Sequence, residues 1–271
     1  METYAATRTV IAPKAASAAA DLAAVNNSFY DHLGDGWYDA HDNPVALLRA
    51  EGELKNPWVS QRLSAHLGGK PGRVLDIGCG AGFLANLLAS QGHRVTGVDM
   101  SQGSLKIARA RSAASGSVPR SPAYRVADAY RLPYRDATFD AVSALDFLEH
   151  VTDPERIVAE AARVLRPGGL FFFHTFNRNR LAWLIVIKGL EWFVRNTPER
   201  MHVLPLFIKP QELEAYCENA GMKTEVITGM RPRLGAPFWK MLATRRVPPD
   251  FSFTFTPSLA ISYLGCARKA Q

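Results

Sequence analysis

The sequence predicts a doubly wound α/β fold with a mainly parallel sheet, an antiparallel closing strand and a helical N-terminal lid. From residue 73 onward, short apolar strand segments alternate with helical segments, which indicates a parallel sheet covered on both faces. Glycines follow the first strand directly, and acidic residues end the next two. Hydrophobic residues make up 47% and charged residues 21% of the 271 positions, a balance that excludes a disordered chain.

The chain divides into one domain and a tail. We expect residues 1–25, which are rich in alanine, to be a flexible tail and residues 26–271 to form a single domain. The lid spans residues 26–68, with helix starts expected at Pro44 and at the Asn56–Pro57 pair. Two insertions are expected, an apolar one at 180–206 and an irregular one at 231–257.

The α/β elements follow in order. The glycines at 168 and 169 are expected to end the helix before the fifth strand. The expected strands are 73–77, 94–99, 123–128, 139–145, 170–175, 223–228 and 259–267, and the expected helices are 81–90, 104–112, 154–165 and 210–221.

Charge and cysteine content limit the functional classes. The net charge of +7 suits a basic enzyme and equally a surface that attracts phosphates or anionic lipid. Cys79, Cys217 and Cys266 are odd in number and widely spaced, so they predict reduced thiols in a cytoplasmic protein. No segment approaches the roughly 20 apolar residues of a membrane span.

The glycine loop after the first strand predicts a nucleotide cofactor. Gly78, Gly80 and Gly82 allow a ligand to approach the backbone closely, but the third glycine comes too early for the dinucleotide pattern. Asp76 lies just before the loop, where its carboxylate would repel a pyrophosphate. The same carboxylate would attract the sulfonium and ammonium groups of S-adenosylmethionine (SAM), which we therefore expect as the cofactor.

Two further carboxylates support this cofactor. Asp99 ends the second strand about 20 residues after the first glycine, where an acidic residue accepts ribose hydroxyls. Asp128 ends the third strand, where it is placed to accept the adenine amino group. The neighbouring Met100 and Ala129 are expected to contact the cofactor as well.

A cluster of ionisable residues follows the fourth strand. Asp146, Glu149 and His150 are spaced to share one face of a helical turn at the carboxyl edge of the sheet, where ligands bind. Together they predict a site for Mg²⁺ or another divalent cation. A structural interpretation also remains, in which Glu149 caps the next helix and His150 packs beside it.

The motifs resemble those of class I SAM-dependent methyltransferases, and more closely the ubiquinone-biosynthesis O-methyltransferase family (2-polyprenyl-6-hydroxyphenol methylase / 3-demethylubiquinol 3-O-methyltransferase). The likeness runs from about residue 26 to 230. Its specific parts are Asp-Phe-Leu-Glu-His-Val at 146–151, Phe-His-Thr-Phe-Asn-Arg-Asn at 173–179 and Phe-Ile-Lys-Pro-Gln-Glu-Leu at 207–213. The resemblance implies a Rossmann-like methyltransferase fold and cofactor contacts at Gly78, Asp99 and Leu145.

The chain departs from this family at two positions. Asp146 stands where the family usually has Glu, which shortens a metal ligand. Val59 stands where the family has an arginine shortly after the Asn-Pro of the lead-in helix, and Arg49 and Arg62 are the candidates to replace it.

The implied chemistry is methylation of a phenol or catechol hydroxyl, whose pKa lies near 10 by the tyrosine reference. Asp146, Glu149 and His150 are the expected catalytic residues. A cation bound there would lower the hydroxyl pKa, and His150 would accept the proton. His174, Asn177, Asn179 and His202 are candidates for the acceptor pocket or for structural roles.

The apolar segment 181–194 carries two tryptophans and is too short to span a bilayer. It is expected either to be a buried lid helix or to cover an isoprenoid tail and lie at the membrane surface. In the second case the protein would be cytoplasmic and peripherally attached to the inner face of the membrane.

Three other functions remain open at this stage. A methyltransferase of secondary metabolism would act on a smaller aromatic acceptor. An RNA methyltransferase is suggested only by the basic charge, and because no nucleic-acid module is recognisable we expect no nucleic-acid partner. A non-catalytic protein would bind SAM without turnover. The sequence does not predict the oligomeric state.

Overall fold

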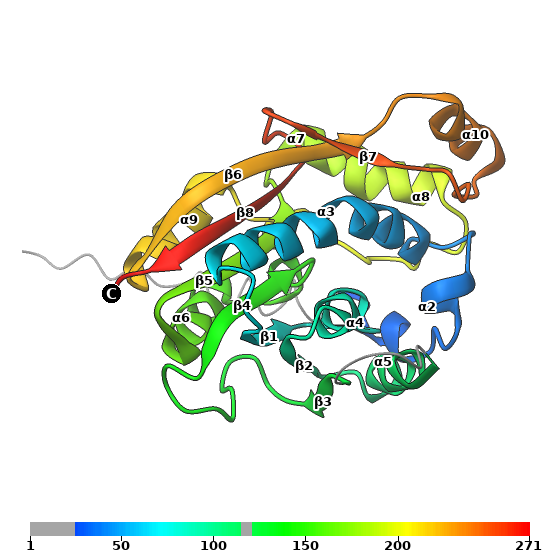
Figure 1. The fold of residues 1–271 in the computed structure, drawn as a ribbon. Coiled ribbons are helices and arrows are strands. Elements are labelled where there is room, and N and C mark those ends of the chain that lie inside the picture. The colour runs from blue at the N-terminus through cyan, green and yellow to red at the C-terminus, as the bar shows by residue number, and fades with distance from the viewer. Residues whose placement is uncertain (1–24, 115–120) are drawn as a thin grey trace, which may run out of the picture.

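The computed structural model describes residues 25–114 and 121–271, and it contains one eight-stranded sheet (Figure 1). The spatial order is β3-β2-β1-β4-β5-β8-β6-β7. The first five strands in this order pair in parallel, whereas β8 is antiparallel to β5 and β6, and β7 is antiparallel to β6. The strands are β1 (Arg73–Ile77), β2 (Arg94–Asp99), β3 (Ala123–Val126), β4 (Phe139–Leu145), β5 (Leu165–Phe176), β6 (Met222–Pro232), β7 (Phe253–Thr256) and β8 (Ser262–Lys269).

Helices cover both faces of the sheet. The pleat sends Phe172 of β5 into a core with the helices of one face, and Phe171 and Phe173 into a core with those of the other. The first face carries α3 (Val45–His66), α4 (Phe83–Ser90) and α5 (Gln102–Ala114); the second carries α6 (Pro154–Val164) and α9 (Pro210–Asn219). The expected doubly wound α/β fold is therefore confirmed.

The lead-in region differs from the expected two helices. Ahead of α3 lie the short helices η1 (Asn27–Asp31) and α2 (Gly36–Asp39). Helix α3 runs through Pro57 without a break, although proline cannot donate the helical hydrogen bond. Ala46 before the proline and Val59 and Leu63 after it are buried in the same core, so packing supports both halves of the helix. Part of the predicted lid is thus a helix that covers the sheet.

The two insertions lie beside one another at one end of the molecule (Figure 1). The apolar one forms a nearly continuous helix in three parts: α7 (Arg180–Ala182), the π-helical η3 (Trp183–Lys188) and α8 (Gly189–Phe193). The second, expected to be irregular, contains the end of β6, helix α10 (Ala236–Thr244) and strand β7. That expectation was wrong because β7 pairs with β6, and α10 packs against α8. The predicted tail lies, but for residue 25, outside the described residues.

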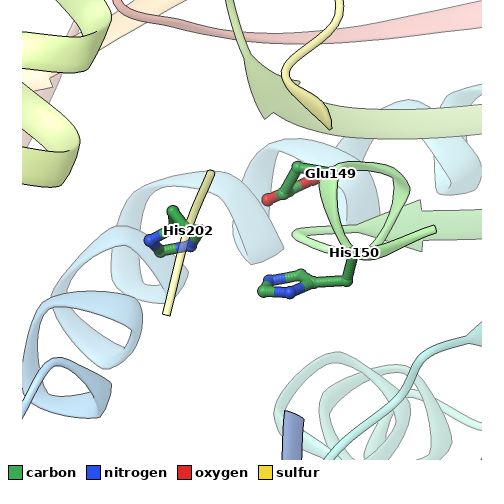
Figure 2. A group of neighbouring side chains, drawn as sticks. All are labelled: Glu149, His150 and His202. Carbon is green, nitrogen blue, oxygen red and sulfur yellow. The ribbon is translucent and has the colours of Figure 1, made fainter. Parts of the chain in front are cut away.

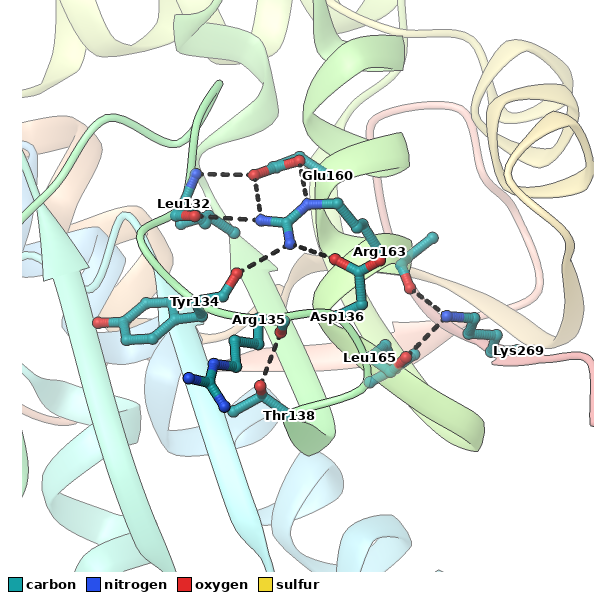
Figure 3. A network of polar contacts seen from close by, with 10 residues as sticks. Leu132, Tyr134, Arg135, Asp136, Thr138, Glu160, Arg163, Leu165 and Lys269 are labelled. Carbon is teal, nitrogen blue, oxygen red and sulfur yellow. Dashed lines mark hydrogen bonds and ion pairs between the residues drawn. The ribbon is translucent and has the colours of Figure 1, made fainter.

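The loop between β3 and β4 is held to α6 by an arginine (Figure 3). The guanidinium of Arg163 binds both carboxylate oxygens of Glu160, the carboxylate of Asp136, and the carbonyls of Leu132 and Tyr134 at 2.7–3.1 Å. Because this loop begins with the residues that follow β3, the network fixes one wall of the cavity described below.

Candidate active site

A cavity of about 560 Å³ lies at the carboxyl edge of the parallel strands, where ligands bind in open α/β sheets. Its lining includes Asp76, Gly78, Gly80, Asp99, Met100, Asp128, Ala129 and Leu145, which are eight of the nine residues expected to bind the cofactor. Gly82 does not line it. With φ at +81° it begins α4, and an added Cβ would lie 2.2 Å from the hydroxyl of Tyr124, so this glycine serves close packing.

The carboxylates at the strand ends shape the end of this cavity where the sequence predicts the cofactor. Asp99 accepts hydrogen bonds from the backbone N–H groups of Gly80 at 2.9 Å and Ser101 at 2.8 Å, which tie the glycine loop to β2. Asp76 accepts a 2.7 Å bond from Ser143, and burial raises the pKa of its carboxyl to about 7. A cationic ligand beside Asp76 would favour the ionised form.

A second group of side chains lies in the middle of the cavity. Helix η2 (Leu148–His150) follows β4 and carries Glu149 and His150, while His202 comes from the chain after α8. One potential ligand atom from each of the three lies within 4.8 Å of the others, and the side chains converge on a common space (Figure 2). The sequence had placed Asp146 in this group instead of His202.

Burial controls the charge of these three residues. It raises the pKa of Glu149 to about 8, helped by the charge of Asp146, and it lowers the pKa of His150 to about 4 and of His202 to about 3. Both imidazoles are therefore neutral at pH 7. Glu149 Oε2 accepts a 2.8 Å bond from Thr175. Among the described residues, no hydrogen-bond partner is found for Glu149 Oε1, His150 Nδ1 or His202 Nδ1.

Asp146 belongs to a different, buried ionic network. One carboxylate oxygen pairs with the ammonium of Lys55 from α3, and the other lies 2.5 Å from Nδ1 of His174 on β5. Lys55 also lies 3.5 Å from Glu51, one helical turn earlier. Burial alone would raise the pKa of Asp146, but Lys55 and His174 hold it well below its usual range. The sequence had not singled out Lys55 or Glu51, because only the fold brings α3 against the end of β4.

The remaining sequence candidates lie outside the cavity lining. Arg49 donates to the carbonyls of Gly36, Trp37 and Ala40 and so braces α2, while Arg62 stacks on Trp58. Asn177 donates to the carbonyl of Leu259, and Asn179 caps α7. Neither arginine lines the cavity, whereas Tyr30 of η1, which the sequence had not indicated, does.

The comparisons with known proteins decide the family. Residues 75–173 match the methyltransferase domain family. The ubiquinone biosynthesis O-methyltransferase of Thiobacillus denitrificans is 38% identical over 203 residues, 74% of this chain and 84% of that protein. The enzyme of the same name from Xylella fastidiosa is 38% identical over 196 residues, 72% of this chain and 77% of that protein.

The chain belongs to the ubiquinone biosynthesis O-methyltransferase family. It is a SAM-dependent O-methyltransferase, as the motifs had indicated. Among solved structures, magnesium protoporphyrin IX methyltransferase from Synechocystis, with bound S-adenosylhomocysteine, has a TM-score of 0.63 at 19% identity and covers 90% of this chain and 96% of its own. A SAM-dependent methyltransferase from Methanosarcina mazei has a TM-score of 0.51 at 23% identity, covering 74% and 93%. Both show the same fold.

Apolar side chains of both insertions also line the cavity of the methyltransferase. They are Ile185 and Val186 of η3, Leu190 of α8 and Phe253 of β7, and we call the part of the cavity that they line the apolar compartment. Ile185 is also 38% exposed at the molecular surface. The apolar compartment therefore adjoins the outer face of the apolar insertion.

Proposed function

We propose that this methyltransferase transfers the methyl group of SAM to a ring hydroxyl of a phenol or catechol that carries an isoprenoid chain, as in ubiquinone biosynthesis. One observation carries the proposal: a single cavity joins the cofactor end, the Glu149–His150–His202 group and the apolar compartment. An acceptor with its ring in the middle and its tail among Val186 and Leu190 would fill this shape.

The residues at the cofactor end match the chemical groups of SAM. Asp99 would accept the ribose hydroxyls and Asp128 the adenine amino group, while Asp76 and the backbone at Gly78 and Gly80 would face the charged methionine portion. Met100, Ala129 and Leu145 would line the nucleoside. This arrangement directs the methyl group toward the middle of the cavity, where the acceptor hydroxyl would lie.

The middle of the cavity would activate the hydroxyl. Glu149, His150 and His202 fit a divalent cation, because each carries a buried atom for which no partner is found among the described residues. A bound divalent cation would supply Lewis-acid chemistry that lowers the pKa of a phenol. The neutral rings of His150 and His202 offer lone pairs for a proton or for such an ion.

Acceptors of increasing chain length test this proposal. We expect kcat/KM on alkyl catechols to rise with each methylene that the apolar compartment buries, by at most about fourfold per group. Leu190→Gln should flatten this rise, whereas Leu184→Gln, at a 44% exposed position outside the cavity lining, should leave it unchanged. A flat response to chain length in the unmodified enzyme would refute the tailed acceptor.

We further propose that the enzyme contacts the membrane through its two insertions. No helix among the described residues is long and apolar enough to cross a bilayer. Apolar side chains that are 38–65% exposed lie on α7, η3, α8 and just before and within α10, and exposed basic residues accompany them. Such a surface suits anionic lipid. The apolar residues are Leu181, Trp183, Leu184, Ile185, Trp192, Leu234 and Trp239.

Co-sedimentation with vesicles tests the membrane contact. Vesicles that contain phosphatidylglycerol should carry the protein down, and replacing Trp192 and Trp239 by serine should reduce the bound fraction. Met100→Ser, at a position that is 68% exposed but lies at the cofactor end, is the matched control. Equal sedimentation with and without vesicles would exclude the peripheral attachment.

A further inference from the structure

The lead-in helix η1 brings a tyrosine to the cavity. Tyr30 lines it and is half-buried. The hydrogen bond found for Tyr30 among the described residues uses its backbone carbonyl, so its hydroxyl has no partner there. By contrast, the hydroxyls of Tyr38, Tyr124 and Tyr263 each donate a hydrogen bond at 2.8–2.9 Å. The Tyr30 hydroxyl is therefore free to bind a ligand in the cavity.

The ring of Tyr30 lies between the two polar parts of the cavity. On one side it stacks on Trp37 at a ring-centre distance of 5.5 Å, and Trp37 covers the glycine loop so closely that an added Cβ at Gly80 would lie 3.0 Å from its ring. On the other side it meets the ring of His150 edge-on at 5.9 Å. A methyl group that passes from SAM to an acceptor beside His150 would cross this region.

Negative charge surrounds the Tyr30 hydroxyl. Burial, followed by the charges of Glu149, Asp146 and Asp99, raises the pKa of Tyr30 further above its usual value of about 10. The hydroxyl thus keeps its proton at neutral pH and can only donate to an anion. Lys55 is the only lysine or arginine among the described residues that line the cavity, and Asp146 already pairs with it. An anionic oxygen formed here would need another donor.

We propose that Tyr30 is a catalytic residue that donates a hydrogen bond to the acceptor oxygen which receives the methyl group. The inference rests on the proposed function, since it takes a phenol or catechol as the acceptor. The acceptor hydroxyl gives its proton to His150, and the Tyr30 hydroxyl stabilises the negative charge left on the oxygen. This oxygen then donates an electron pair to the methyl carbon, and the pair of the carbon–sulfur bond neutralises the sulfonium. Tyr30 keeps its proton throughout.

Hydrogen bonds from helix α5 hold the backbone of Tyr30 in place. Ser104 Oγ donates to the carbonyl of Tyr30 at 3.1 Å, and Ser101 Oγ donates to Ser104 Oγ at 2.9 Å. The backbone N–H of Ser101 donates to Asp99 at 2.8 Å. Because Asp99 is the proposed ribose ligand, these bonds connect the cofactor end to Tyr30. The hydroxyl is thereby positioned independently of the acceptor, as electrostatic stabilisation requires.

The ionisation of bound 4-nitrocatechol tests the proposal without turnover. The full-length enzyme is saturated with S-adenosylhomocysteine and 4-nitrocatechol, and visible absorption is followed across a pH series. Tyr30→Phe keeps the ring contacts and removes only the hydroxyl. We expect the pKa of the bound nitrocatechol to be higher in Tyr30→Phe by about one to two units, the equivalent of one hydrogen bond to a charged group. The affinity for S-adenosylhomocysteine should remain unchanged, because the hydroxyl serves the acceptor.

Tyr38→Phe is the matched control. It removes a hydroxyl from the same lead-in region, at a residue outside the cavity lining whose hydroxyl donates to the carbonyl of Ala81. The pKa of the bound nitrocatechol should be the same in this variant as in the unmodified enzyme. During turnover of catechol, the acid limb of the pH profile of kcat should move to higher pH in Tyr30→Phe only.

Equal ionisation of the bound nitrocatechol in the unmodified enzyme and in Tyr30→Phe would overturn the inference. A loss of S-adenosylhomocysteine affinity in Tyr30→Phe would also overturn it, since the hydroxyl would then serve the cofactor. No binding of nitrocatechol to the unmodified enzyme would overturn it together with the phenolic acceptor. The expected shift in ionisation, together with a flat response to chain length, would leave the role of Tyr30 standing and refute only the tailed acceptor.

Discussion

Lys55→Met isolates the ionic contact that joins helix α3 to the end of β4. Methionine keeps the length of the side chain and is a good helix former, so the variant removes mainly the charge. In the folded protein, burial alone would lower the pKa of Lys55, but the carboxylates of Asp146 and Glu51 more than offset it and raise the pKa. The side chains of Lys55 and Asp146 are only 3% and 15% exposed, so little water would replace the lost ammonium.

The expected loss of stability is large. Removing one partner of a buried ion pair costs about 3–5 kcal/mol, because the other charge stays buried after losing its main compensation. For a domain of this size, that corresponds to a fall in Tm of about 6–20 °C. Asp146→Asn should cost less, since Lys55 retains Glu51 at 3.5 Å and the amide oxygen still accepts a hydrogen bond.

The double variant provides the decisive comparison. Lys55→Met with Asp146→Asn should be more stable than Lys55→Met alone, since no buried Asp146 carboxylate then remains without its ammonium partner. Urea unfolding at pH 7 measures all four corners of the cycle. A loss below about 1 kcal/mol in Lys55→Met, or no recovery in the double variant, would refute the buried pair.

The pH dependence gives an independent check on the same contact. The pKa of Asp146 is held below its usual range in the folded state, so the pair contributes stability above the unfolded-state pKa of about 3.9. That contribution is lost as the pH falls from there through the depressed folded pKa. The difference in unfolding free energy between the unmodified enzyme and Lys55→Met should therefore shrink as the pH falls below about 4.

Three further predictions concern the cofactor end. Burial raises the pKa of Asp76 to about 7, and the ammonium of S-adenosylhomocysteine favours the ionised carboxylate. The affinity for S-adenosylhomocysteine, measured by calorimetry, should therefore fall about tenfold per pH unit below pH 7. Asp76→Asn should remove this pH dependence. Gly78→Ala should abolish cofactor binding, since the added Cβ would lie 2.3 Å from Phe147 at a position with a φ of +67°. The control is Gly68→Ala, which has a similar φ of +59° but no atom within 4 Å of the added Cβ, and it should bind the cofactor normally. Asp99→Asn should weaken binding by about 10- to 150-fold, the value of a hydrogen bond to a charged group, and an unchanged Kd would exclude its ribose role.

The local pattern predicted most of the α/β framework. The expected bounds of β1, β2 and β4 agree with the structure, because these strands are short apolar runs whose ends are marked by glycine or aspartate. The second insertion was less predictable. Strand β7 exists through its pairing with β6, a contact across about 24 residues that no local periodicity indicates.

The linear pattern of residues was enough to predict the family, the cofactor class and the eight cavity-lining residues at or just after the strand ends. In a parallel sheet the strand ends share one edge, so their position along the chain already places them together. Which ionisable residues meet in the middle of the cavity depends on the folded arrangement. Lys55 lies on α3 and His202 lies in the chain after α8, so both are distant in sequence from the end of β4. Folding pairs the ammonium of Lys55 with Asp146 and brings His202 beside Glu149 and His150.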